Sequence, residues 1–118
     1  MRPIFVLASL ALFASTAAAQ ADALPLKRGV YVETGYACKG APAVGLVGYY
    51  GDRLAPGHDS CRIVSTRKAG GATQARLKCS SGAAVTWMVR PQGAAAFART
   101  VDGQSASYRW CAATAKAL

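Results

Sequence analysis

The sequence predicts an all-β domain: a small antiparallel meander of about seven strands that closes as a barrel or a two-layer sandwich and is stapled by two disulfides. Three observations predict this class. Glycine-containing turns separate short apolar runs after residue 22, and four cysteines are distributed among these runs. In addition, no window of about eleven residues in this region sustains a helical apolar period.

The expected strands are short and follow one another at regular spacing. They span residues 28–34, 43–50, 61–67, 73–79, 83–90, 94–100 and 105–111. The clearest alternation is QARLKC, which places Leu77 and Cys79 on one face, and AVTWMVR repeats it with Trp87 and Val89. The short SSGA connection between these two runs predicts a hairpin. A meander of this length is expected to close or to hide its edges.

The first residues predict a secretory signal peptide over residues 1–21. Arg2 precedes an uncharged apolar run, and small residues allow cleavage after Ala19 or after Ala21. The run is shorter than the roughly 20 residues of a membrane-spanning helix, and no second run of that length follows. We therefore expect a periplasmic or secreted protein with one domain over residues 22–118 and no transmembrane segment after processing.

Four cysteines in a small exported domain predict two disulfides. Cys38, Cys61, Cys79 and Cys111 allow three pairings, and the sequence leaves all three open. Pairing of neighbours, Cys38 with Cys61 and Cys79 with Cys111, would give each bond about 3 to 4 kcal/mol on the chain-entropy estimate. No Cys-x-x-Cys or Cys/His spacing indicates a metal site or a redox motif.

The last expected strand, SASYRWC, allows two arrangements. Alternation places Tyr108 and Trp110 on one face and Arg109 and Cys111 on the other. We favour the arrangement in which the rings pack inside and Cys111 reaches its partner from the rim, because buried rings supply apolar area and a buried lone arginine is costly. In the alternative, Cys111 bonds to Cys79 in the interior and the rings form an exposed platform.

Candidate catalytic residues are few. His58 stands beside Asp59 and Ser60, but adjacent side chains in a turn point apart, whereas a catalytic triad must converge. The other acids give a paired-carboxylate mechanism little support, and no glycine-rich phosphate loop occurs. We therefore expect no enzyme, no catalytic residue, no metal and no cofactor.

The charge balance is the remaining functional signal. The chain has 14 lysines and arginines against five acids, a formal net charge of +9, of which processing would remove Arg2. A possible binding surface comprises cations expected on solvent-facing sides of neighbouring strands: Arg62, Arg67, Lys68, Arg76, Lys78 and Arg90. Arg99 and Arg109 could add to it. A basic sheet face attracts anionic partners such as lipopolysaccharide, phospholipid headgroups or an acidic protein, although solvated faces that only keep the protein in solution are the simpler interpretation.

The run from LPLKRGVYVETGYAC through SCRIVST and ARLKC to YRWC resembles uncharacterised small exported bacterial proteins with four cysteines and a terminal Tyr-Arg-aromatic-Cys motif. The resemblance implies an exported, stapled β fold and transfers no catalytic residue. A looser similarity, in size and architecture only, is to periplasmic lysozyme inhibitors, whose inhibitory loop motif is not recognisable in this chain.

Together these observations predict a non-enzymatic periplasmic or secreted binding module whose basic surface contacts an anionic envelope component or protein. Nucleic acid is not an expected partner, because export separates the chain from it and no aromatic side chains are interleaved with the cations. The alternative is a protein inhibitor of a lysozyme or protease. It would use a rigid loop such as residues 38–50 or 51–61.

Overall fold

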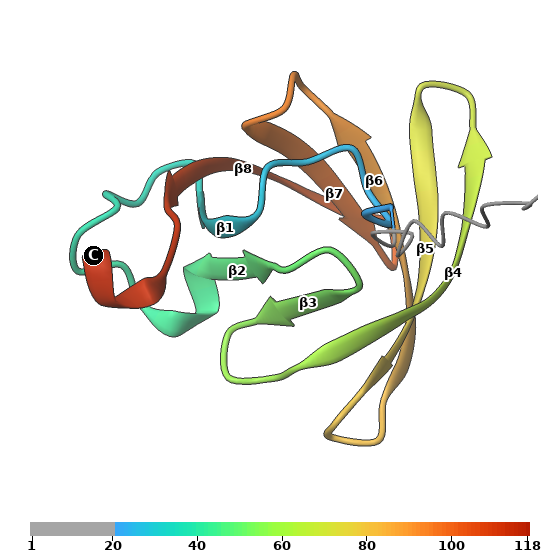
Figure 1. Cartoon of the computed structure of the whole chain (residues 1–118), viewed down its shortest axis with the longest axis horizontal. Helices are drawn as coiled ribbons and strands as arrows, with labels where there is room; N and C mark the ends of the chain where they lie inside the picture. Colours follow the sequence, from blue (N-terminus) through green and yellow to red (C-terminus); the bar gives the residue numbers. More distant parts are fainter. Residues whose placement is uncertain (1–20) are drawn as a thin grey trace, which may run out of the picture.

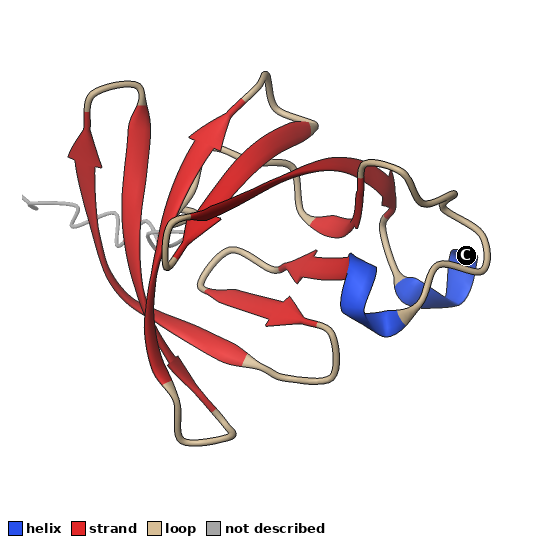
Figure 2. Ribbon diagram, turned by 180° about the vertical axis from the view of Figure 1, so that it is seen from behind, coloured by secondary structure: helices blue, strands red, loops and turns tan. Residues whose placement is uncertain are grey.

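The structure, a computed structural model, describes residues 21–118 as an eight-stranded antiparallel barrel. Each strand pairs with the next in sequence, and β8 pairs with β1 to close the barrel (Figure 1). The strands are β1 (Gly29–Glu33), β2 (Leu46–Tyr49), β3 (Arg53–Pro56), β4 (Cys61–Ala69), β5 (Ala72–Cys79), β6 (Ala84–Pro91), β7 (Ala96–Val101) and β8 (Gln104–Ala112). Two short 3-10 helices complete the described elements (Figure 2): η1 (Ala43–Gly45) and η2 (Ala115–Ala117). The predicted signal peptide lies outside the described residues except for Ala21.

The predicted class and closure are confirmed, and one strand was missed. The β5–β6 hairpin has the predicted alternation, with Leu77, Cys79, Trp87 and Val89 buried. The structure has eight strands, whereas we expected about seven. The missed strand is β3, whose four residues, RLAP, contain no β-branched side chain and end in proline, so it carries little of the usual strand signal.

Aromatic side chains fill the barrel interior. Tyr31 from β1, Phe97 from β7 and Tyr108 from β8 are fully or almost fully buried. Phe97 meets Tyr31 edge to face and stacks on Tyr108, with ring centroids 5.1 Å apart in both pairs. Three large rings thus supply much of the apolar area that a small domain with many alanines otherwise lacks.

The segment before β1 closes one end of the barrel. Leu24 and Leu26 are buried in the same core cluster as the strand residues. The Leu24 backbone N–H donates to the Tyr49 hydroxyl, and that hydroxyl donates to the Leu24 carbonyl, each at 2.9 Å. Asp22 pairs with Arg28 across the same segment. Residues 22–28 are therefore part of the fold and not a tail.

The two disulfides join Cys61 to Cys79 and Cys38 to Cys111. Cys61 and Cys79 lie directly opposite each other on β4 and β5, so their bond crosses one strand pair inside the barrel. The pairing of neighbours considered from the sequence is wrong, because the hairpin brings Cys61 to Cys79 and leaves Cys38 for Cys111. Two disulfides in a β domain of this size fit an extracellular compartment.

The last strand has the favoured arrangement of the two weighed from the sequence. Tyr108 is buried, and Trp110 is half-buried against the core, where its Nε1 donates to the Arg28 carbonyl at 3.0 Å. Cys111 bonds to Cys38 and not to Cys79, so the exposed aromatic platform is ruled out. Gly29 has a φ of 139°, and a Cβ there would lie 2.5 Å from Trp110 Nε1. The ring thus requires a glycine at this position.

The loop between β1 and β2 is held against the outside of the barrel. Val32 on β1 and Arg109 on β8 are paired and share the outer face, where Val32 is nonetheless fully buried. Arg109 Nη2 donates to the Tyr36 carbonyl at 3.0 Å, and the Cys38–Cys111 bond fixes the same loop. Figure 1 places this loop and the C-terminal end on one side of the barrel. Within residues 21–118, no helix is long and apolar enough to cross a membrane.

Candidate functional site

Three cations form a row across the outside of β3, β4 and β5. Arg53 lies directly opposite Arg62, and Arg62 lies directly opposite Lys78. All three side chains are exposed. Directly opposed residues of antiparallel strands have Cβ atoms about 5 Å apart, and like charges at this spacing repel each other. The row therefore concentrates positive charge at a cost in stability.

The basic surface continues along the same strands. Arg76 on β5 lies opposite Ser65, and Arg67 on β4 lies opposite Gln74, so both arginines share the outer face with Lys78. On β6, alternation from Met88, the partner of Gln74, places Arg90 on this face as well. We call this set the basic face: Arg53, Arg62, Arg67, Arg76, Lys78 and Arg90.

The basic face differs from the predicted surface at two positions. Lys68 is paired with the buried Thr73, so it lies on the other side of β4 from Arg67 and is exposed only at the end of the strand. Arg53 was not predicted, because it belongs to the missed strand β3 and its neighbours are known only from the register. The other five predicted cations, those of β4, β5 and β6, lie on one face.

Acidic side chains are scarce around the basic face. The sequence contains no aspartate or glutamate between Asp59 and Asp102, an interval that includes all of β4 through β7, and Asp52 lies just before β3. The salt bridge found among residues 21–118 joins Arg28 to Asp22 and lies outside these strands. The positive charge of the basic face is therefore not neutralised by the strands that carry it, which favours binding of an external anion.

Two open hollows lie on the basic face, one on each side of Arg76. The first, of about 320 Å³, is polar and is lined by Ser65, Thr66, Arg67, Gln74 and Arg76. The second, of about 330 Å³, is lined largely by apolar residues together with two cations: Val64, Arg76, Leu77, Lys78, Ala84, Val85 and Thr86. Arg76 can thus reach an anion seated in either hollow.

Two further arginines, considered for this surface from the sequence, make contacts elsewhere in the structure. Arg99 is paired with the buried Val89 and points into the barrel, where its guanidinium carbon lies 4.7 Å from the Trp87 ring centroid and 5.1 Å from that of Tyr108. Stacking on two rings compensates part of the cost of burying this cation. Arg109 is exposed but donates to the Tyr36 carbonyl of the β1–β2 loop. The suggestion that Arg99 faces solvent is therefore wrong.

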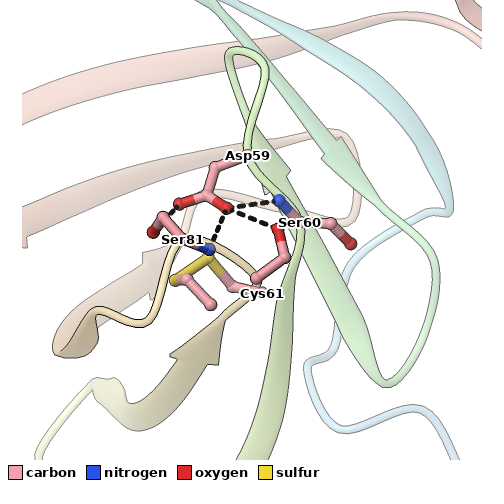
Figure 3. The surroundings of a disulfide bond; sticks show 6 residues. Asp59, Ser60, Cys61 and Ser81 are labelled. Atoms are coloured by element: carbon pink, nitrogen blue, oxygen red, sulfur yellow. Dashed lines mark hydrogen bonds between the residues drawn. A yellow bond between two sulfur atoms is a disulfide. The ribbon is translucent and has the colours of Figure 1, made fainter.

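Asp59 and Ser60, which follow His58 in the sequence, lie in a turn beside the Cys61–Cys79 disulfide (Figure 3). Asp59 accepts hydrogen bonds from the Ser81 hydroxyl at 2.8 Å, the Ser80 hydroxyl at 2.9 Å and the Ser60 N–H at 2.8 Å. These bonds, above all those from the Ser81 and Ser80 hydroxyls, hold the pKa of Asp59 below its usual range. The carboxylate thus ties the β3–β4 turn to the β5–β6 turn, and His58 is exposed beside it.

Asp59 also lies near Cys61 and Cys79, and the three side chains could in principle hold a metal ion. Both sulfur atoms are bonded to each other, however, and the carboxylate oxygens accept hydrogen bonds from serines. Cysteine binds a metal ion as a free thiolate, which a disulfide sulfur is not. The cluster therefore fits a structural role in this oxidised state.

Comparison of the chain with models of protein families, with curated proteins and with solved structures finds no match.

Proposed function

We propose that this chain is a non-enzymatic binding module, periplasmic or secreted, whose basic face contacts an anionic envelope component or an anionic protein. The observation that carries the proposal is the Arg53–Arg62–Lys78 row. Repulsion within such a row destabilises the free protein, and a bound anion would relieve it. Binding of an anion would therefore offset the loss of stability that this row of cations causes.

The composition of the basic face supports the same proposal. Five of its six cations are arginines, whose planar guanidinium forks suit phosphate, sulfate and carboxylate groups. Export through the predicted signal peptide would place this surface among envelope anions. The predicted localisation and the binding function thus support each other.

The test compares two double variants of equal net charge. In Arg62→Gln/Lys78→Gln the basic face loses two cations, and in Lys39→Gln/Lys116→Gln the loss falls in the β1–β2 loop and in η2. Binding of each variant to heparin beads is measured over a series of salt concentrations. We expect the first variant to elute at clearly lower salt and to show a shallower dependence of log K on log salt. Equal behaviour of the two variants would show that only net charge matters.

A second candidate function, inhibition of a lysozyme or protease, is favoured by the β1–β2 loop. This loop is fixed by the Cys38–Cys111 bond, and Val44 within it is 79% exposed. A rigid loop that presents an apolar side chain is the arrangement that preorganised inhibitors use. Stoichiometric inhibition assays on a panel of lysozymes and proteases, with Val44→Asp as the comparison, test this candidate. Absence of inhibition across the panel would reject it.

A further inference from the structure

Among the described residues, the strands of the basic face carry one exposed large hydrophobic side chain, at a β-bulge. Ile63 is paired with Leu77 and Ser65 with Arg76, so Val64 is the extra residue of β4 and has no partner on β5. Its side chain is 48% exposed. A bulge redirects side chains relative to regular alternation. This bulge therefore places an aliphatic group among the cations of β4 and β5.

Val64 contributes to the apolar hollow beside Arg76. The lining of this hollow of about 330 Å³ has an apolar part and a cationic part. The apolar part includes Val64, Ala84 and Val85, and the cationic part is Arg76 and Lys78. An anion that consisted of charge alone would leave the apolar part in contact with water. A ligand with a hydrocarbon part next to its anionic group would satisfy both parts of the lining.

The size and openness of the surface indicate how much of such a ligand it would hold. A volume of about 330 Å³ is at the lower end of the range for small-molecule pockets, roughly 300 to 1,000 Å³. It therefore accommodates a headgroup and the beginning of a chain, not a whole lipid. The rest of the ligand would remain outside, as it does when a protein rests on the surface of a bilayer.

We propose that the basic face binds phosphate-bearing lipids at an anionic bilayer surface, with the phosphate at Arg76 and Lys78 and the adjoining hydrocarbon against Val64. This inference rests on the proposed function and specifies its ligand. Arginine forks match phosphate geometry, and the remaining cations of the face add attraction to neighbouring headgroups. The inferred ligand is thus an anionic amphiphile, whereas a soluble polyanion such as heparin would engage only the cations.

A nucleic acid fits this face less well. Proteins that bind single strands stack bases on exposed aromatic side chains. Among residues 21–118, the exposed large aromatic side chains are Tyr36 and Tyr50, and neither lies on β4, β5 or β6. The face offers an aliphatic group and cations, which is the combination that lipid headgroups require.

The experiment is co-sedimentation of the processed protein with phosphatidylcholine vesicles that either contain or lack phosphatidylglycerol. We expect binding only to the vesicles that contain the anionic lipid. Val64→Ser should weaken this binding by about threefold or more, because the contact with hydrocarbon is lost and the charge is retained. Arg76→Gln should weaken it as well. The matched controls Val44→Ser and Lys116→Gln, both far from the face, should bind like the wild type, and circular dichroism verifies that each variant is folded.

The outcomes separate this inference from the proposed function. Heparin beads should retain the Val64→Ser variant as strongly as the wild type, since heparin has no hydrocarbon chain. Retention on heparin without binding to anionic vesicles would overturn the lipid inference and leave the proposed function standing. Failure on both supports would overturn both. The lipid inference would also be overturned if Val64→Ser bound anionic vesicles as strongly as the wild type does. Full displacement of the wild-type protein from these vesicles by inorganic phosphate at matched ionic strength would overturn it too.

Discussion

Arg62 and Lys78 lie directly opposite each other on the outer faces of β4 and β5, and Arg53 lies on the other side of Arg62. Like charges in directly opposed positions of a sheet are destabilising, by a few tenths of a kcal/mol to about 1 kcal/mol. Among residues 21–118, the salt bridge joins Arg28 to Asp22, so none of these three cations is offset by an ion pair. The arrangement thus exchanges stability for a concentrated positive charge.

The first prediction follows from this exchange. In Lys78→Glu, the new carboxylate lies opposite Arg62 and two residues from Arg76 on the same face of β5, so it replaces repulsion with attraction. We expect the free energy of unfolding to rise by about 0.5 to 1 kcal/mol, while binding to heparin beads weakens. Urea unfolding at low salt measures the first effect, and elution salt measures the second.

The control for this prediction is Lys116→Glu, which makes the same charge change in η2. It should leave stability within about 0.5 kcal/mol of the wild type. The stability gain of Lys78→Glu should also shrink at high salt, because exposed charges are screened. A destabilised Lys78→Glu protein would show that the row is not under repulsive strain.

The second prediction concerns the Cys38–Cys111 bond, which links residues 73 positions apart, whereas Cys61–Cys79 links residues 18 apart. The chain-entropy estimate gives the longer loop about 4 kcal/mol and the shorter about 3 kcal/mol. Cys38→Ser/Cys111→Ser should therefore lower the free energy of unfolding by about 4 kcal/mol. The double variant should also have a freer β1–β2 loop. Trypsin should therefore cleave it at Lys39 at a trypsin concentration and digestion time that leave this site intact in the wild type.

The pairing itself is checked by mass spectrometry of the unreduced, proteolysed protein. One linked peptide should contain Cys38 and Cys111, and another should contain Cys61 and Cys79. A peptide that links Cys38 to Cys61 would contradict the register of β4 and β5, since that register places Cys79 opposite Cys61.

Much of the fold was predictable from local pattern. The alternation around Leu77 and Trp87, the glycine-rich turns and the even number of cysteines predicted a closed, stapled β meander. The first two reflect rules that act within one strand or one hairpin, and the third is a count over the chain. The pairing of Cys38 with Cys111 could not be predicted, because it depends on how the barrel brings its first and last strands together. Local alternation contains no information on such a contact.

The candidate site was predictable only in part for the same reason. Arg62, Arg76 and Lys78 lie on strands with clear alternation, so their shared face could be expected. Arg53 lies on a strand whose sequence gives little strand signal, and Arg99 turns inward because Trp87 and Tyr108 offer it two rings. The hollow at Val64 depends on a β-bulge that shifts the register of β4 against β5. No residue pattern in the sequence predicts this bulge.

The third prediction concerns the segment that closes the barrel end. Leu24 is 1% exposed and packs in the core, and its backbone N–H and carbonyl both bond to the Tyr49 hydroxyl. Leu24→Ala should lower the free energy of unfolding by about 2 to 4 kcal/mol through lost burial and a cavity. Val44→Ala, at an exposed position, should change it by less than about 0.5 kcal/mol. Equal effects in urea unfolding would mean that residues 22–28 do not close the barrel.

The last prediction is a loss of stability in alkali through Tyr31. Burial raises the pKa of this hydroxyl to about 12, against an ordinary value of 10.0. The hydroxyl donates to the Lys27 carbonyl at 2.6 Å, a bond that only the protonated form can make. Burial also raises the pKa values of Tyr49 and Tyr108. Because the unfolded chain loses these protons first, the stabilisation is complete below pH 10 and is lost as the pH rises toward 12. Tyr31 alone should account for about 2 kcal/mol of this loss. Urea midpoints across this range, measured in parallel for Tyr31→Phe, should fall less steeply for the variant, and equal slopes would show that Tyr31 titrates alike in the folded and unfolded chains.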